Sequence, residues 1–326
     1  MNIYSLGCAY AMCFTALFSS VAVGAEVSAG TDAKCLGLVP LSEDFSRQDL
    51  FKEVLPQDAA LKKTYEDFAV KNQFNFPTDV SFDEALKKPR ENSLFGIDIS
   101  HHNGANFPIE YLKPNKSIFI YIKASQGAKF LDPRFASNWK RAGEVKLHRG
   151  AYHFLTSGDP GTDAESWGRE QAATFIKIIK ANGGLLATDM PPAVDVEWDK
   201  ASASGPDRWS ARKPHEIIAM IRAFSDQLEQ DLKRKPIIYT AYSWWEPRMG
   251  GVENFSDVAD HQLWLADYSA KSQASEVPRT INKAAWALWQ FTDKARLTSN
   301  PGKQFDASIF KGSSADFYKN LGVAEF

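Results

Sequence analysis

Short apolar runs alternate with helix-like segments through the last two thirds of this chain. Segments at 133–145, 163–180 and 214–232 have the apolar spacing of amphipathic helices. Continuous apolar strands that helices separate form a parallel sheet with covered faces, and this many repeats predict closure into a barrel. An open doubly wound sheet is the alternative, although no glycine-rich phosphate loop follows the first run. The runs typical of strands lie at 94–100, 117–124, 150–154, 190–199, 236–242, 262–266 and 286–290.

The run at 190–199 carries two acids in an otherwise apolar strand. Because side chains alternate along a strand, Asp195 and Glu197 project from one face and the neighbouring valines from the other. An enclosed carboxylate loses hydration, so such acids are costly unless they are solvated, paired or used in chemistry. This stretch therefore predicts an acid pair, with an ordinary salt-bridging role as the alternative.

Other polar and aromatic side chains also stand near the ends of the expected strands. In a parallel barrel the chemistry takes place at the carboxyl ends of the strands. Asp98 ends the first strand, Tyr152 and His153 end the third, Tyr239 lies in the fifth, and Trp289 and Gln290 end a late one. We expect several strands to direct acids and aromatic rings into one mouth.

The first 25 residues have the character of an export signal. Residues 5–25 contain no charged side chain and end in small residues, which predicts cleavage after Ala25. An uncleaved membrane anchor is the alternative, since about 20 apolar residues can span a bilayer. Cleavage would remove Cys8 and Cys13 and leave Cys35 alone, which excludes an internal disulfide and a cysteine metal site.

Residues 26–93 are expected to form a short helical extension and linker before a main domain at 94–326. Apolar spacing predicts helices at 49–55 and 59–70, and a third at 81–86, where Ser81 and Glu84 have capping-box spacing. Helices this short do not fold alone. The extension either packs on the main domain, or covers a cleft or docks a protein partner.

Composition and motif spacing exclude several classes of function. The 326-residue chain has a formal net charge of only −2, so it lacks the electrostatic footprint of a protein that binds nucleic acid or an anionic membrane. The serines lack a nucleophile-elbow context. His101, His102 and His153 lack the spacing to carboxylates that a metal site needs, so we expect no metal and no cofactor.

A series of ordered motifs resembles glycoside hydrolase family 25, the lysozyme family, over residues 94–326. The resemblance implies a TIM-like α/β barrel with five βα units and irregular final strands, of the (β/α)5(β)3 type. It also implies cleavage of the β-1,4 bond between N-acetylmuramic acid and N-acetylglucosamine in peptidoglycan. The motifs are FGIDISHHNG, YIKASQGAKFLDPRFASNWKRAG, GAYHFL, PPAVDVEWD, KPIIYT, LWLADY and WALWQFT.

Carried over by motif, the functional acids would be Asp98, Asp195, Glu197 and Asp306, the last in a modified form of the closing motif. Glu197 would be the general acid, because neighbouring negative charges and enclosure by Trp198 favour its protonated form. Asp195 would stay ionised and orient the substrate. The retention of configuration in the family implies that the sugar's own N-acetyl group is the nucleophile.

Aromatic rings offer flat apolar surfaces to sugars, although each ring could instead belong to the core. A glycan-binding module without catalysis and a chitin-directed glycosidase are the alternatives to a muramidase. The residues that we expect to bind substrate are Tyr121, Tyr152, His153, Tyr239, Trp264 and Trp289.

Overall fold

The computed structural model describes residues 73–83, 87–202, 204–250 and 256–326. The expected signal at 5–25, the expected helices at 49–55 and 59–70, and Cys35 lie outside these residues. Within the described ranges, no helix is both long enough and apolar enough to cross a membrane.

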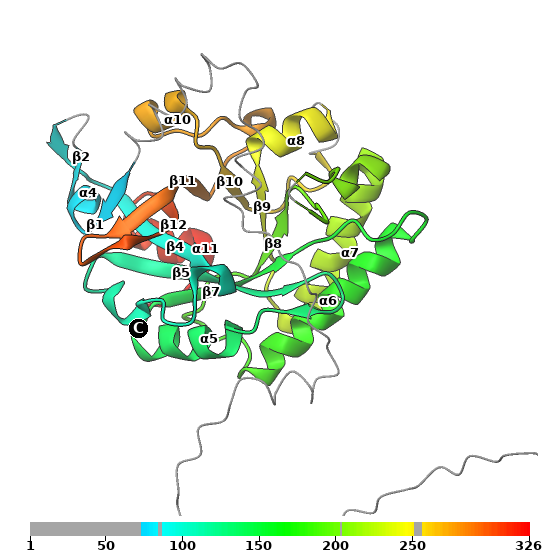
Figure 1. Cartoon of the computed structure of the whole chain (residues 1–326), viewed down its shortest axis with the longest axis horizontal. Coiled ribbons are helices and arrows are strands. Elements are labelled where there is room, and N and C mark those ends of the chain that lie inside the picture. Colours follow the sequence, from blue (N-terminus) through cyan, green and yellow to red (C-terminus); the bar gives the residue numbers. More distant parts are fainter. Residues whose placement is uncertain (1–72, 84–86, 203, 251–255) are drawn as a thin grey trace, which may run out of the picture.

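Eight strands close into a mixed barrel, which confirms the expected fold class (Figure 1). Each neighbouring pair from β4 through β11 is parallel. The last strand, β12, runs antiparallel to both β11 and β4 and completes the ring, which rules out an open sheet. The strands are β4 (Ser93–Ile99), β5 (Ser117–Gln126), β7 (His148–Phe154), β8 (Ala193–Val196), β9 (Ile237–Ala241), β10 (Leu263–Ala266), β11 (Leu288–Leu297) and β12 (Asn300–Lys311).

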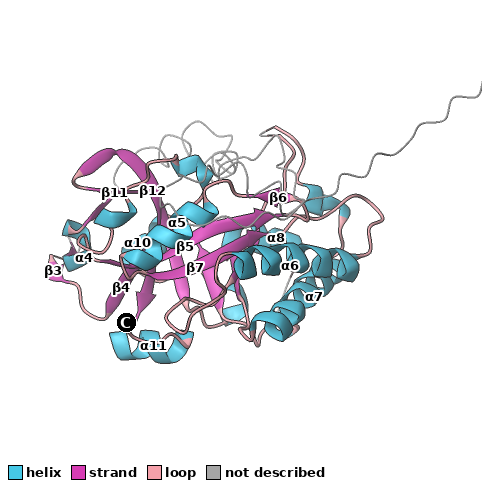
Figure 2. Ribbon diagram, turned by 90° about the horizontal axis from the view of Figure 1, so that it is seen from below, coloured by secondary structure: helices cyan, strands magenta, loops and turns pink. Residues whose placement is uncertain are grey.

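Helices cover the outside of the barrel (Figure 2). The three long ones, α5, α6 and α7, agree with the predicted helices to within two residues at each end. Asp163 caps α6 by accepting a hydrogen bond from the Ser166 amide, and Pro214 opens α7. The helices are α5 (Phe135–Glu144), α6 (Ala164–Ala181), α7 (Pro214–Leu232), α8 (Tyr242–Met249), α10 (Ala270–Ser275) and α11 (Ser314–Leu321).

The described part of the extension joins the barrel sheet. Strand β1 (Phe74–Phe76) pairs in parallel with β11, and helix α4 (Thr78–Ser81) follows it. The predicted helix at 81–86 is wrong, because β2 (Phe82–Asp83) is extended and pairs with β3 (Lys88–Pro89). The backbone bond from the Arg90 amide to the Ser81 carbonyl, 3.0 Å long, ties the two chain segments together, so pairing outweighs the capping pattern.

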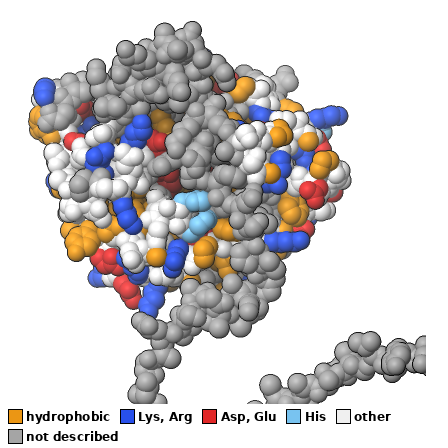
Figure 3. Space-filling model, viewed as in Figure 1, with side chains coloured by type: hydrophobic (Ala, Val, Ile, Leu, Met, Phe, Trp, Pro, Cys, Tyr) orange, Lys and Arg blue, Asp and Glu red, His pale blue; other side chains and the backbone are white. Residues whose placement is uncertain are grey.

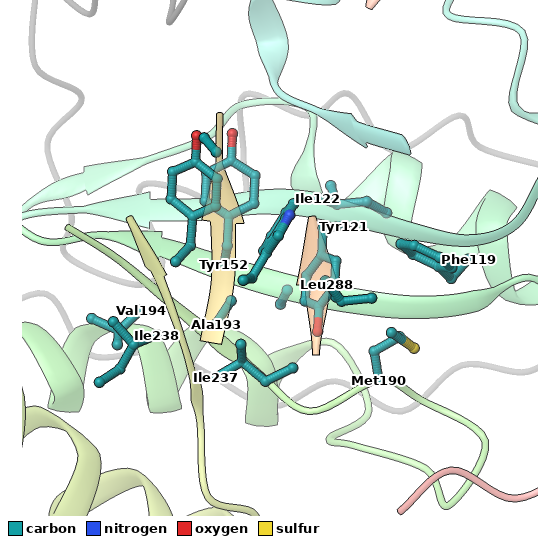
Figure 4. Close-up of a cluster of buried hydrophobic side chains, with 14 of the residues drawn as sticks. Phe119, Tyr121, Ile122, Tyr152, Met190, Ala193, Val194, Ile237, Ile238 and Leu288 are labelled. Carbon is teal, nitrogen blue, oxygen red and sulfur yellow. The ribbon is translucent and has the colours of Figure 1, made fainter. Parts of the chain in front are cut away.

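Glycines let large aromatic rings fill the barrel interior. A Cβ atom at Gly96 would lie 2.2 Å from the Phe119 ring, and one at Gly150 would lie 2.3 Å from the Tyr121 ring. Any larger residue at either position would clash with its neighbouring strand. Figure 4 shows Tyr121 and Tyr152 in this core beside Leu288 and Ala193. The remaining short elements are β6 (Phe130–Leu131) and 3-10 helices at His101–Asn103, Ile109–Tyr111, Arg208–Ala211 and Ile281–Lys283.

Candidate active site

The acid pair lies at the carboxyl end of β8. Asp195 is the register partner of Tyr239 on β9, whose side chain lies inside the barrel, so Asp195 also projects from the inner wall. Glu197 follows two residues later on the same side, and both acids are fully buried. The backbone beneath them is held by Thr240, which donates to the Val196 carbonyl at 2.7 Å, and by Trp209, which donates to the Glu197 carbonyl at 2.8 Å.

A second pair of acids meets where the barrel closes. Asp98 on β4 and Asp306 on β12 are direct register partners on antiparallel strands. Asp98 is 2% exposed and Asp306 is half-buried. Like charges directly opposite each other destabilise a sheet. Two carboxylates at this position therefore carry a stability cost, which is typical of a functional site.

Gln290, which the sequence places at the end of a late strand but not among the expected site residues, connects to this second pair. The Gln290 amide nitrogen donates to an Asp98 carboxylate oxygen at 2.6 Å. The Gln290 amide oxygen accepts bonds from the hydroxyls of Tyr239, at 2.8 Å, and Tyr268, at 2.5 Å. Burial, and then the charge of Asp306, raise the pKa of Tyr268 well above its usual value, so its phenol stays a donor. The sequence signal for Gln290 is its place at the end of a late strand and in the WALWQFT motif, and that for Tyr268 is its place in the LWLADY motif.

Asp199, the third acid of the 190–199 run, has a structural role. Asp199 accepts bonds from the Ser157 amide at 2.8 Å and the Ser157 hydroxyl at 3.1 Å, and forms an ion pair with Arg208. The nearby Asp207 accepts from the Trp244 indole at 3.0 Å. These contacts fix the chain that leaves the acid pair.

Histidines form part of the rim after β4. His101 is half-buried, and its Nδ1 lies 2.9 Å from an Asp132 carboxylate oxygen. The rings of His101 and His102 are 4.1 Å apart. Figure 3 shows histidine side chains gathered near the centre of the face of the molecule that it draws. Among the residues that the structure describes, no group of three His, Cys, Asp or Glu side chains is arranged to hold a metal ion.

Two of the aromatic candidates belong to the barrel core. Tyr121 is fully buried, its hydroxyl donates to the Pro191 carbonyl at 2.9 Å, and burial raises its pKa. Pro191 precedes β8, so this hydroxyl points to the end of the barrel opposite the acids. The centre of the Trp264 ring lies 4.5 Å from that of Tyr121, and its indole donates to Ser308 at 2.9 Å. Neither side chain is placed to bind a sugar.

His153 and Trp289 face outward, away from the barrel interior. His153 is fully buried between β7 and the helices, where it bonds to Ser125 at 2.7 Å and stacks on Phe224. Burial lowers the pKa of His153 to about 3, so the ring is neutral at physiological pH. The Trp289 indole donates to the Asp267 carbonyl at 2.9 Å. Of the six expected substrate-binding residues, Tyr152 and Tyr239 remain on the inner wall beside the acids.

A mixed barrel with four carboxylates on its inner wall suits the acid chemistry of glycoside hydrolysis. Residues 97–300 match the model of glycosyl hydrolases family 25, and the chain belongs to this family. The family resemblance expected from the motifs is confirmed, and the protein is a glycoside hydrolase.

Relatives of this chain include muramidases and lysozymes. It is 31% identical over 208 residues to the N,O-diacetylmuramidase of Chalaropsis sp., covering 61% of this chain and 87% of that protein. It is 28% identical over 237 residues to Lysozyme M1 of Streptomyces globisporus, covering 72% and 73% of the two chains. Among solved structures, a family GH25 lysozyme from Aspergillus fumigatus aligns with a TM-score of 0.56 at 28% identity, covering 71% of this chain and all of that one (100%).

Proposed function

We propose that this protein is a muramidase that hydrolyses the β-1,4 bond between N-acetylmuramic acid and N-acetylglucosamine in peptidoglycan. The observation that carries the proposal is the placement of Asp195 and Glu197 side by side at the carboxyl end of β8, on the inner wall. The names of its relatives, a lysozyme and an N,O-diacetylmuramidase, support the choice of substrate.

Glu197 is the proposed general acid. It donates its proton to the glycosidic oxygen as the bond to the anomeric carbon breaks, so the leaving sugar departs as an alcohol. Burial of Glu197 beside Asp195 favours the protonated state that this step needs. Glu197 is then ionised and can accept a proton from the incoming water.

Asp195 is the proposed orienting residue. In its ionised form it holds the N–H of the sugar's acetamido group, whose carbonyl oxygen attacks the anomeric carbon from the face opposite the leaving group. Water then opens the resulting cyclic intermediate from the first face, so the configuration at the anomeric carbon is retained. Asp98 and Asp306 lie across the barrel, where their negative charge stabilises the cationic sugar.

Export is part of the proposal. Residues 1–25 would direct the chain out of the cytoplasm and be removed, and 26–93 would form an extension to the barrel domain at 94–326, with a protein partner as one role for it. The charge-free stretch at 5–25 supports this, as does a polymeric substrate that lies outside the membrane. Nucleic acid and a lasting membrane association have no place in this function.

The test is a digest of defined peptidoglycan with the purified protein, its products identified by mass. We expect fragments with new reducing N-acetylmuramic acid ends. Chitin oligomers in a parallel digest distinguish a chitin-directed enzyme, which would cleave them faster than peptidoglycan. Binding to peptidoglycan without any cleavage, where a control lysozyme is active, would overturn the proposal in favour of a binding module.

A further inference from the structure

We propose that Gln290 is a positioning residue for the reaction: its amide holds the Asp98 carboxylate, and Tyr239 and Tyr268 fix the direction of that amide. The inference rests on the proposed function, because it assigns Asp98 a task in the cleavage step. It adds three side chains, from β9, β11 and the turn after β10, to the machinery at the closing edge of the barrel.

The position of the amide follows from the strand order. Gln290 lies on β11, which pairs with β10 and β12, yet its side chain bonds to Asp98 on β4 and Tyr239 on β9. An amide can reach both strands only across the interior, so it lies inside the barrel. Gln290 is fully buried there.

The hydrogen-bond pattern specifies which end of the amide faces Asp98. The two phenol donors occupy the acceptor positions of the Gln290 oxygen, and the nitrogen is left facing the carboxylate. A flipped amide would bring its oxygen against a negative charge and its nitrogen against the two phenols, which could then only accept. The tyrosines therefore select one orientation, in which Gln290 is a donor to Asp98.

A hydrogen-bond donor beside Asp98 affects the balance between its ionised and its protonated form. Asp98 stands opposite Asp306, and Asp293 on β11 adds a further negative charge near Tyr268. These charges disfavour ionisation of Asp98, whereas a hydrogen bond from a neutral amide favours it. On the neighbouring strand β5, the Lys123 Nζ donates to Gln126 at 2.6 Å. Gln290 thus supplies a donor to the Asp98 carboxylate and holds it in one orientation.

The turn that carries Tyr268 is itself held firmly. The Asp267 amide donates to the Gln290 carbonyl at 3.1 Å, which joins the turn to β11. The Asp267 carboxylate accepts bonds from the Arg279 amide and side chain, both at 2.8 Å, and from the Ser272 hydroxyl at 2.5 Å. Arg279 also lies over the Tyr242 ring, 4.3 Å from its centre. The phenol is therefore presented to Gln290 by a fixed loop.

The test is Gln290→Glu, which keeps the shape but replaces the donor by a second acid 2.6 Å from Asp98. At neutral pH the two carboxylates repel, and we expect kcat/KM to fall about 100-fold. At lower pH the two carboxyl groups share one proton, so the acid at position 290 can donate a hydrogen bond to Asp98. The factor by which kcat/KM of the variant falls below that of wild type should therefore shrink at least about tenfold between pH 7 and 5. A loss that is the same at every pH would overturn the proposal.

Gln171→Glu is the matched control. Gln171 is equally buried, but it bonds to Thr156 and His153 outside the acid cluster. This variant reports the general cost of burying a carboxylate. The ratio of its kcat/KM to that of wild type should not rise between pH 7 and 5. Tyr268→Phe should lower kcat several-fold with KM unchanged, because the amide loses one of its two orienting donors. An unchanged kcat in this variant would count against the proposal.

A second measurement separates this inference from the proposed function. The unfolding free energy of Gln290→Glu, compared with Gln290→Met, should fall as pH rises from 5 to 7, because the folded state holds the shared proton and the unfolded state releases it. Parallel stability curves would overturn the contact between Gln290 and Asp98. A wild-type protein that cleaves no peptidoglycan would overturn the proposed function, and with it the positioning role, even if the stability curves diverge.

Discussion

Asp98 and Asp306 face each other as direct partners on antiparallel strands β4 and β12, at the point where the barrel closes. The pairing brings together two acids that are separated by most of the domain. One acid ends the first barrel strand and the other lies in the last, so neither is in place until the barrel is complete. The acid site is therefore a consequence of closure.

Replacing Asp306 tests the cost of this pairing. Asp306→Asn removes the like charge opposite Asp98, so the unfolding free energy should rise by about 0.2–1 kcal/mol, while activity on peptidoglycan falls. Thermal unfolding and initial rates on the same preparation check both effects. Lower stability together with full activity would show that Asp306 is only a structural residue.

The neutral state of His153 predicts a specific dependence of stability on pH. Its pKa is about 3 when folded, because of burial, and about 6.5 when unfolded. Between these values the unfolded chain binds a proton that the folded chain does not, so the unfolding free energy should decrease by about 1.4 kcal/mol for each unit that pH falls.

His153→Asn removes that titration and keeps a polar side chain at the site. The difference in unfolding free energy between wild type and this variant, measured by urea denaturation, should shrink as pH falls from 6.5 toward 4. A difference that stays constant with pH would mean that His153 is solvated or charged in the folded protein.

The close contact at Gly150 predicts a strong effect of one methyl group. Gly150→Ala would place a Cβ atom 2.3 Å from the Tyr121 ring, so the core must shift, at a cost of about 1–3 kcal/mol. Gly302→Ala is the control, because a Cβ atom there meets nothing within 4 Å. Equal melting temperatures for the two variants would contradict this packing.

Arg90 attaches the segment of β1, β2 and β3 to the barrel. Its guanidinium pairs with Asp83 at 3.4 Å and with Glu276, and it lies 5.8 Å from the centre of the Phe95 ring. Arg90→Ala removes one partner each from the buried Asp83 and the half-buried Glu276, which keeps its pair with Lys311, and should cost about 1–3 kcal/mol, with activity per folded molecule unchanged. The Lys140→Ala variant, which breaks an exposed pair with Glu144, should have little effect on stability. Equal stability of the two variants would show that Arg90 does not attach the segment.

The barrel and the β8 acids could be predicted from the sequence because both depend on local patterns. Apolar runs between helices indicate a parallel barrel, and the spacing of Asp195 and Glu197 puts them on one face whatever their surroundings. The sequence predicts Asp306 only through the closing motif, since the irregular pairing of β12 leaves no clear periodicity.

The finer assignments needed the closed structure. A position at the end of a strand does not reveal which face the side chain occupies. The sequence therefore groups His153 with Tyr152, although His153 points the opposite way. Gln290 carries no charge, and its place at the end of an apolar run does not show which residue it contacts. Its role depends on a contact with Asp98, 192 positions away in the chain, which exists only once β11 and β4 flank β12.

The most direct test of the account concerns the proton that Glu197 supplies. Glu197→Gln should reduce cleavage of peptidoglycan about 10³-fold, because the leaving oxygen departs without a proton. A substrate of the same sugar with a dinitrophenol leaving group needs no proton, so the variant should cleave it within about tenfold of the wild-type rate. Unchanged cleavage of peptidoglycan, or an equal loss on both substrates, would contradict the assignment of Glu197 as the general acid.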